Sequence, residues 1–159
     1  MTDSWLFTLA LAAALGSGLI AGVFFAFSTF VMRALNRRPA GEGMAAMQAI
    51  NVAVINPLFL GVFLGTAVLS GIAIVAGWMR WGEPGAAFLV TGGAFYLFGT
   101  FLVTILFNVP LNNSLAAVTP ADPEGGQRWA RYVSRWTVWN HVRTAAALAA
   151  LGFFAVALR

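Results

Sequence analysis

The chain has 159 residues, of which 60% are hydrophobic and only 9% are charged, and it contains no cysteine. Soluble domains carry about 25% charged residues, so a soluble chain of this length could not bury so much apolar surface. The missing cysteine excludes disulfides, thiolate metal sites and thiol catalysis. All nine basic residues are arginine, and their positions beside apolar runs indicate membrane topology, which argues against nucleic-acid binding.

Four long runs without Asp, Glu, Lys or Arg predict four membrane-spanning helices. A helix needs about 20 apolar residues to cross a hydrocarbon core about 30 Å thick. The runs also lack the two-residue alternation of a membrane β-barrel. The sequence therefore predicts an all-α, four-transmembrane-helix bundle that forms a single integral membrane domain over residues 1–159. The spans are expected at about 5–31, 57–78, 86–107 and 138–158.

The first apolar run is predicted to remain as a membrane span. Its N-terminal residues include Asp3 and no basic residue. Its apolar stretch is longer than the roughly 7–15 residues of a secretory signal. A turn is expected around Pro39 and Gly41, because both residue types interrupt helices. A moderately apolar helical stretch over 42–55 follows.

The second and third spans are predicted to form an antiparallel hairpin. Asn56 is a plausible N-cap for a helix that begins at Pro57, and the link at 80–85 is short. The third span is expected to end near Asn108, just before Pro110. From Gln127, aromatic and polar residues recur at three- and four-residue steps, which predicts a juxtamembrane helix that continues into the fourth span.

The arginines predict the orientation of the bundle. Seven of the nine flank the two longer loops, and only Arg80 and Arg159 lie toward the other side. The positive-inside rule then places the longer loops and the juxtamembrane segments in the cytoplasm. We expect a multi-pass protein of the plasma (inner) membrane with both termini outside.

Two glycine pairs at GxxxG spacing, Gly18 with Gly22 and Gly61 with Gly65, favour close contact between helices. Packing within one subunit explains them, and a homo-oligomer is the alternative.

Amide, imidazole and guanidinium groups gather at the predicted cytoplasmic ends of the spans. Polar groups without partners are costly at membrane depth and usually face the bundle interior or a wet cavity. We therefore expect three separate segments to contribute side chains to one site in the cytoplasmic leaflet. The candidate residues are Gln48, Asn51, Asn56, Asn108, Asn112, Trp136, Trp139, Asn140, His141 and Arg143.

Several of these candidates have a purely structural alternative. Asn56 is typical of a cap, and Asn108 could satisfy backbone groups freed by Pro110. Arg143 could reach phospholipid headgroups, and the tryptophans could form an interfacial belt. The phenylalanines of the first span, including Phe24, are expected to make ordinary lipid or core contacts.

The sequence offers few ligands for a cofactor. His141 is the only histidine, and the spans hold no carboxylate. A carboxylate–histidine metal site and a bis-His haem within one subunit are therefore excluded, and no metal or other cofactor is expected. Besides membrane lipids, the partner expected from the amides, the cation and the apolar surroundings is a flat, apolar, weakly acidic molecule.

The order of several motifs resembles a known family. The motifs are the runs 21–28 (Ala-Gly-Val-Phe-Phe-Ala-Phe-Ser), 31–32, 47–51, 56–57, 108–112 (Asn-Val-Pro-Leu-Asn) and 136–143 (Trp-Thr-Val-Trp-Asn-His-Val-Arg). Together they resemble the anthrone-oxygenase-like family of small four-helix integral membrane proteins, over essentially the whole chain. Arg33 departs from the pattern, because a proline is expected there, and the departure would alter the rim of the cavity.

The resemblance implies oxidation of a flat phenolic or quinone-precursor substrate, such as an anthrone, by O2 without metal or flavin. It assigns anion stabilisation to Arg143 and Asn140, and substrate positioning to the other amides. His141 would be the base, since an imidazole can accept a proton near neutral pH. However, residues two apart on a helix point in different directions, so His141 and Arg143 cannot face the same way.

Two other functions remain open at this point. The same pocket could belong to a non-catalytic membrane protein that binds a lipid, a quinone or a partner subunit. A small transporter is the third possibility, and the lack of carboxylates in the spans argues against it.

Overall fold

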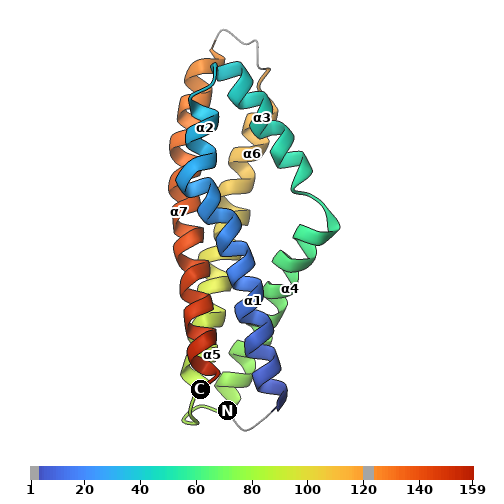
Figure 1. The fold of residues 1–159 in the computed structure, drawn as a ribbon, viewed down its shortest axis with the longest axis vertical. Helices are drawn as coiled ribbons and strands as arrows, with labels where there is room; N and C mark the ends of the chain where they lie inside the picture. Colours follow the sequence, from blue (N-terminus) through green and yellow to red (C-terminus); the bar gives the residue numbers. More distant parts are fainter. Residues whose placement is uncertain (1–3, 120–123) are drawn as a thin grey trace.

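The computed structural model describes residues 4–119 and 124–159, and this part of the chain is helical with no strand. The all-α fold predicted from the sequence is therefore confirmed. The elements in chain order are α1 Ser4–Ala26, η1 Phe27–Val31, α2 Met32–Asn36, α3 Ala40–Ala53, α4 Pro57–Met79, α5 Ala86–Ala94, η2 Phe95–Leu102, η3 Thr104–Asn108, α6 Val109–Ala116 and α7 Gly125–Ala157. The elements labelled η are π-helical, and Figure 1 shows how the helices lie side by side.

Four helical rods are long and apolar enough to cross a membrane, over residues 4–36, 57–79, 86–116 and 125–157. The chain is thus a membrane protein with the four spans that the sequence predicts. The first, third and fourth rods extend beyond the limits predicted for the spans. At about 1.5 Å per residue, the 33 residues of α7 reach about 50 Å. The expected juxtamembrane helix is the first half of α7, continuous with the span.

The connections at both ends of α4 follow the sequence closely. Asn56 caps α4, because its Oδ1 accepts a hydrogen bond from the Phe59 amide at 3.0 Å. The hairpin to α5 turns through Gly82 and Gly85, with φ angles of +98° and +90°. Only glycine adopts this left-handed backbone without steric cost. The predicted cap and hairpin are both confirmed.

The third rod does not end at Asn108, contrary to the sequence prediction. The helix continues through Pro110 to Ala116. Just before the proline, the Val109 amide donates to the Thr104 carbonyl, a π-type step of five residues. Proline at the second position of α6 is tolerated because the first turn of a new helix does not require its N–H.

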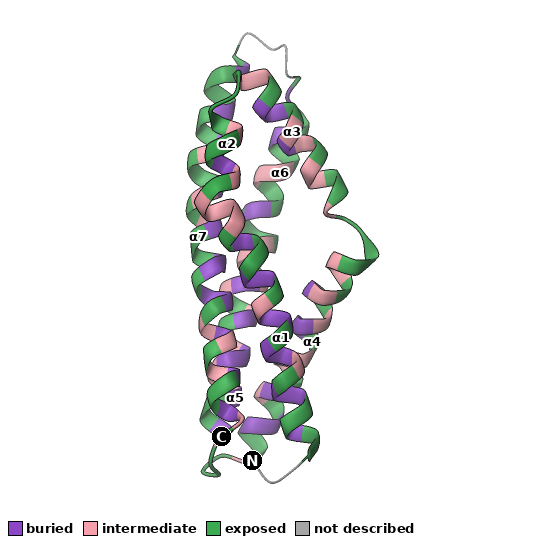
Figure 2. Ribbon diagram, in the orientation of Figure 1, coloured by how far each residue is buried: buried purple, intermediate pink, exposed green. Residues whose placement is uncertain are grey.

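Two groups of buried side chains divide the bundle along its length (Figure 2). One lies where α1, α4, α5, η2 and α7 meet, near the marked chain ends, and it is rich in alanine. The other joins α2, α3, α6 and the first half of α7, and consists mainly of methionines and aromatic rings. It contains Met32, Met44, Met47, Leu115, Val118, Trp129, Tyr132 and Trp136.

The GxxxG pairs do not bring helices of this chain together as expected. A Cβ atom added at Gly22, Gly61 or Gly65 would meet nothing within 4 Å, and one at Gly18 would meet only Leu151. Close helix approaches occur at other glycines. A Cβ atom at Gly93 would lie 2.6 Å from the Ser70 carbonyl oxygen, and one at Gly77 would lie 2.7 Å from the Ala86 carbonyl oxygen.

Candidate functional site

A cavity of about 500 Å³ lies between the two cores, under the elbow that joins α3 to α4. Figure 1 shows this elbow standing away from the other helices. Most of the wall is aromatic and aliphatic, with contributions from Phe24, Phe27, Phe59, Phe63, Phe101 and Trp136. Its polar residues are Gln48, Asn51, Thr104, Asn112, Asn113 and Arg143.

Arg143 places a guanidinium group in the wall of this cavity. The residue is only 5% exposed. It lies about 21 Å along α7 from the end of the helix at Ala157, whereas a hydrocarbon core is about 30 Å thick. The cation therefore lies inside a candidate membrane span, among buried residues. Arg143 faces the cavity and not the exposed surface of α7, and its role in a site stays a prediction.

Hydrogen bonds and aromatic rings hold the guanidinium in place. One terminal nitrogen donates to Asn140 Oδ1 at 2.7 Å, and the other donates to Thr104 Oγ1 at 3.3 Å. The guanidinium carbon lies 3.9 Å from the centroid of the Phe24 ring and 5.1 Å from that of Trp136. Rings stabilise a cation through their negative faces, most strongly where water is excluded. These contacts partly replace the water that Arg143 lost on burial.

Asn140 acts behind the cavity wall, where it orients Arg143. It is fully buried. Its Nδ2 donates to the Phe24 carbonyl and to Ser28 Oγ, each at 2.7 Å. The amide orientation is thereby fixed, and Oδ1 points toward the guanidinium. Asn140 is therefore a positioning residue, because it links α7 to the first rod and fixes the direction of the cation.

Two buried donors at the site have no hydrogen-bond partner. They are the Nε–H of Arg143 and the Nδ2 of Asn51, and both residues line the cavity. A buried donor without a partner costs about 1–3 kcal/mol. In addition, the carboxylates of Glu42, Glu83 and Glu124 are all exposed at helix ends or in the hairpin. Within the described residues, the charge of Arg143 is therefore uncompensated, and the site favours an anionic or acidic guest.

A second group of hydrogen bonds joins α3, α6 and α7 beside the cavity. Asn112 Oδ1 accepts from Tyr132 Oη at 2.9 Å and from Trp136 Nε1 at 2.8 Å. Gln48 uses Nε2 to donate to the carbonyls of Leu115 and Val118 at 2.8 and 2.9 Å. These bonds fix α3, α6 and α7 relative to one another, so the cavity is preformed.

All three π-helical segments lie at the level of the site. Ser28 belongs to η1, Thr100 to η2 and Thr104 to η3. Thr100 Oγ1 donates to the Arg143 carbonyl at 3.3 Å, and Asn108 Nδ2 donates to the Trp136 carbonyl at 3.3 Å. A π-helical turn changes the direction of the side chains that follow it and often marks a functional site. Here the π segments turn short polar side chains toward α7.

More than half of the chain matches the model of a known protein family. The family model is described as anthrone oxygenase, and it matches residues 57–153. The chain belongs to the anthrone oxygenase family. No curated protein and no solved structure matches it. The matched part runs from α4 into α7 and includes Thr104, Asn112, Asn140 and Arg143, while α1 and α3 lie outside it.

The site of this family member contains half of the residues predicted from the sequence. The cavity wall includes Gln48, Asn51, Asn112, Trp136 and Arg143. Asn140 and Asn108 are fully buried just behind it. The Asn108 amide bonds to the Trp136 carbonyl of α7, not to a backbone group at Pro110 as the structural alternative supposed.

Three predicted site residues lie elsewhere. His141 is exposed on the face of α7 that points away from the cavity, because two helical steps separate it from Arg143 by about 200°. Trp139 stacks on Phe107 with centroids 3.6 Å apart, outside the cavity lining. Asn56 is exposed and acts as the cap of α4. Arg33 is also exposed and does not reach the cavity rim.

Several site residues are absent from the prediction. Thr100 and Thr104 could have been found from their four-residue spacing with the predicted Asn108, because residues four apart share one side of a helix. Ser28 and Phe24 carry no comparable signal. Phe24 belongs to the buried core, as predicted, and its ring also lies against the guanidinium of Arg143.

Within the described residues, no group of three or more His, Cys, Asp or Glu side chains could hold a metal ion.

Proposed function

We propose that the protein oxidises a flat phenolic substrate of the anthrone type with O2, and that Arg143 stabilises the anion from which the reaction proceeds. The observation that carries this proposal is a buried guanidinium with no carboxylate partner among the described residues, in the wall of a largely apolar cavity. Membership of the anthrone oxygenase family supports the choice of substrate class.

The first chemical step is loss of a proton from the methylene carbon of the substrate, which lies opposite the carbonyl in the central ring and is conjugated with it through the aromatic rings. The electron pair left on carbon is delocalised onto the oxygen, which gives an enolate. An anion about 4 Å from a guanidinium gains about 4 kcal/mol at an effective dielectric constant of about 20, a factor of about 10³ in the deprotonation equilibrium. Preorganised donors such as Arg143 Nε–H and Asn51 Nδ2 stabilise this charge without reorganising.

The remaining steps need O2 as the only oxidant. The enolate gives its electrons to O2 and forms a carbon–oxygen bond, and proton uptake yields a hydroperoxide. Cleavage of the oxygen–oxygen bond of the hydroperoxide, with loss of the hydrogen on the same carbon, releases water and leaves the second carbonyl of the quinone. One anthrone and one O2 give one anthraquinone and one water, so atoms and electrons balance. O2 is apolar and enters the same apolar cavity.

Within the described residues, the cavity wall contains no histidine and no carboxylate that could act as the base. We therefore infer that the proton leaves to water or hydroxide at the cavity mouth, and that Arg143 makes this step favourable. His141 is not needed in this scheme.

The substrate enters from the lipid. Around the cavity mouth lie exposed apolar side chains, among them Val52 at 75%, Ile55 at 70% and Leu64 at 46% exposure. In a membrane, these surfaces face acyl chains, in which a flat apolar phenol dissolves readily. Such a route selects apolar substrates before any contact with Arg143.

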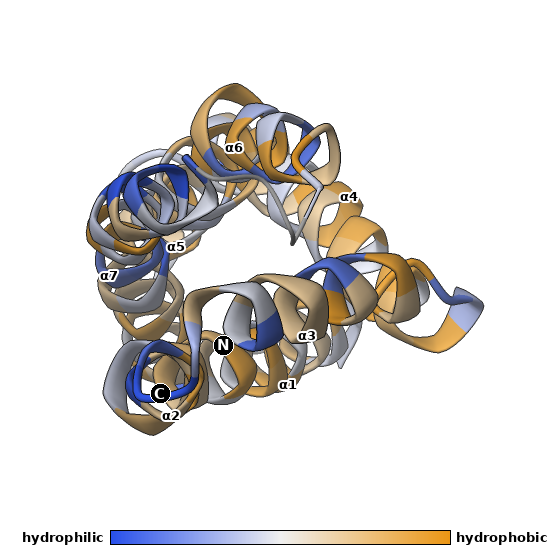
Figure 3. Ribbon diagram, turned by 90° about the horizontal axis from the view of Figure 1, so that it is seen from above, coloured by the Kyte–Doolittle hydropathy of each residue, from blue (hydrophilic) through white to orange (hydrophobic). Residues whose placement is uncertain are grey.

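Arginine placement supports a plasma-membrane orientation with both termini outside and the α2–α3 and α6–α7 connections in the cytoplasm. Figure 3, a view along the bundle, shows hydrophilic segments on α7 and mostly hydrophobic ones on α1 and α4. The site then lies in the cytoplasmic leaflet. A homo-oligomer through the open glycines of α4 is compatible with this arrangement.

The test is oxidation of an anthrone by the purified protein in lipid nanodiscs, followed by O2 consumption and quinone absorbance. Arg143→Met keeps the approximate length of the side chain but removes the charge, and it should lower kcat/KM by about 10²–10³, as loss of a charge-stabilising donor does. Arg37→Met is the matched control, because Arg37 is exposed at a helix end. Thermal unfolding verifies that both variants fold.

The proposal fails if a panel of anthrones and hydroquinones gives no quinone, or if Arg143→Met turns over like wild type. A bound apolar ligand without O2 consumption would favour the alternative, a non-catalytic membrane protein that uses the cavity to bind a lipid or quinone.

A further inference from the structure

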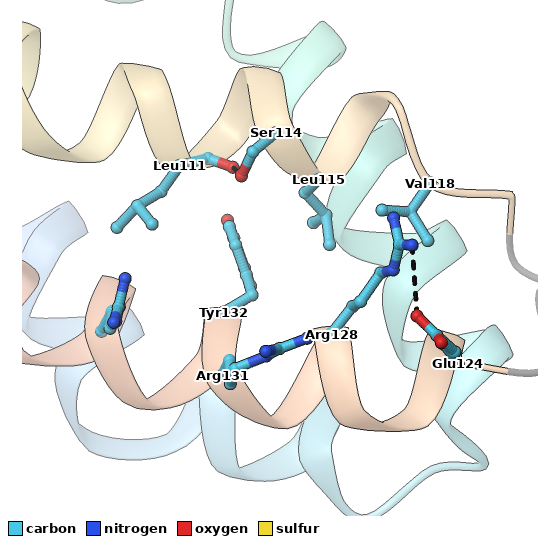
Figure 4. A pocket seen from close by; sticks show the side chains of 9 residues that line it. Leu111, Ser114, Leu115, Val118, Glu124, Arg128, Arg131 and Tyr132 are labelled. Atoms are coloured by element: carbon cyan, nitrogen blue, oxygen red, sulfur yellow. Dashed lines mark hydrogen bonds and ion pairs between the residues drawn. The ribbon is translucent and has the colours of Figure 1, made fainter.

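A second pocket, of about 370 Å³, lies between α6 and the first half of α7 at the end of the bundle opposite the chain ends. Figure 4 shows Leu111, Ser114 and Leu115 on α6 facing Tyr132 on α7, with Arg128 and Arg131 beside them. The pocket is distinct from the Arg143 cavity. The residues that line it are Leu111, Ser114, Leu115, Val118, Glu124, Arg128, Arg131, Tyr132 and Arg135.

The pocket carries a net positive charge. Three arginines and one glutamate line it, which gives a net charge of +2. Glu124 pairs with Arg128 at 3.3 Å, as the dashed line in Figure 4 marks. Arg131 and Arg135 are four residues apart and therefore lie on one side of α7. The two exposed guanidinium groups are thus close enough to act on one anion.

The depth of the pocket places it at the lipid headgroups. Arg135 lies about 33 Å along α7 from the helix end at Ala157, and Arg131 lies one turn farther. The hydrocarbon core is about 30 Å thick, and phosphate groups lie just beyond it. A phospholipid in the adjacent leaflet would therefore present its phosphate to these two arginines.

The other wall of the pocket is apolar. Leu115 and Val118 are buried, and Leu111 is half-buried. Such a wall suits the glycerol and first methylene groups of a lipid, while a free phosphate ion would gain nothing from it. Charge at one side and apolar surface at the other match the amphiphilic structure of a phospholipid.

We propose that this pocket binds the phosphate group of an anionic phospholipid. Arg131 and Arg135 hold the phosphate oxygens, since the planar guanidinium fork matches phosphate geometry. The leucines of α6 contact the start of an acyl chain. Basic pockets between membrane helices recognise lipid headgroups in this way. The proposal does not depend on the reaction at Arg143.

Native mass spectrometry of the full-length protein in detergent tests the site, with added phosphatidylglycerol, phosphatidylcholine or inorganic phosphate as probes. Wild type should retain phosphatidylglycerol in preference to phosphatidylcholine. The double variant Arg131→Gln with Arg135→Gln should lose about tenfold or more of that retention. The matched control is Arg33→Gln with Arg37→Gln, which removes two exposed charges from the same end of the bundle.

Retention that falls only in the pocket variant, and returns in part when both positions carry lysine, supports the proposal. An equal loss in the control would overturn it, because the lipid would then respond to the general positive charge of this end. Displacement of the lipid by millimolar inorganic phosphate would also overturn it, since the occupant would then be a soluble ion. Circular dichroism checks that the exposed substitutions leave the helices intact.

Discussion

The two halves of the bundle differ in how closely their helices approach. In the closed half, formed by α5, η2, the later turns of α4 and the later turns of α7, glycine and alanine let backbones meet. A Cβ atom at Gly99, for example, would lie 2.5 Å from Ala146 Cβ. In the open half, formed by η1, α3, the first turns of α4, η3, α6 and the middle of α7, rings and amides keep the helices apart. The cavity is the result.

This difference assigns stability to the closed half and chemistry to the open half. Lipid provides no hydrophobic force between helices, so close packing of small residues must hold the bundle together. The closed half provides that packing. The open half can then hold a buried cation, which costs about 2.5–3.5 kcal/mol on insertion scales at the centre of a span. We expect substitutions in the open half to affect turnover and those in the closed half to affect unfolding.

After loss of the Arg143 charge itself, the largest expected effect is that of a new carboxylate in the open half. Thr104 Oγ1 lies 3.3 Å from a guanidinium nitrogen of Arg143, so Thr104→Asp would place an anion beside the cation. The positive charge that stabilises the enolate would be cancelled. We expect kcat/KM for anthrone oxidation to fall about 10²-fold, while helix content measured by circular dichroism stays the same.

Thr104→Val is the matched control for this change. It has nearly the size of threonine and removes one neutral acceptor, so only a loss of about tenfold or less is expected. Equal losses in the two variants would mean that shape at this position, and not charge, governs turnover.

In the closed half, Gly93→Ala should lower stability by about 1–3 kcal/mol, the usual cost of overpacking. The new methyl group would lie 2.6 Å from the Ser70 carbonyl oxygen and 2.6 Å from Ile74 Cγ1. The Ser70 carbonyl is part of the backbone and cannot move away as easily as the end of a side chain. Unfolding in a series of detergent mixtures measures the change, and turnover per folded molecule should match wild type.

Gly61→Ala is the control on the open side of α4. No atom lies within 4 Å of the new methyl group, and alanine favours the helix, so stability should hold or rise. A loss of stability in this variant would instead indicate that Gly61 packs against a second copy of the chain. Comparing the two alanine variants therefore tests both the closed half and the proposed oligomer.

Much of the fold was predictable, because charge-free runs and caps act locally. The start of α4 follows from Asn56 and Pro57, and the hairpin follows from the short link at 80–85. The continuation through Pro110 was not predictable. It depends on a π-type hydrogen bond from Val109 to Thr104, which no residue type specifies on its own.

Site residues of a type that is rare in membrane spans could be predicted from the sequence. Residues whose place depends on the direction of the side chain were assigned wrongly or missed. Arg143 stood out as a cation inside a span, and it lines the cavity. The direction of a side chain depends on helix phase, which is why Trp139 lies outside the cavity. Thr104 was missed because threonine is common in spans, where its hydroxyl usually bonds to its own helix. Here it does so through the Thr100 carbonyl, and it also accepts from Arg143.

The smallest effect is expected at His141. The imidazole lies on the exposed face of α7, away from the Arg143 cavity. If proton loss depends on Arg143 and water, then His141→Ala should change kcat/KM by less than about twofold, and the pH profile of turnover should keep its shape. A drop of about 10²-fold with a lost acid limb would show that a histidine accepts the proton after all. That result would require the imidazole of a second copy at the cavity mouth, because helix phase keeps the residue's own imidazole away from Arg143.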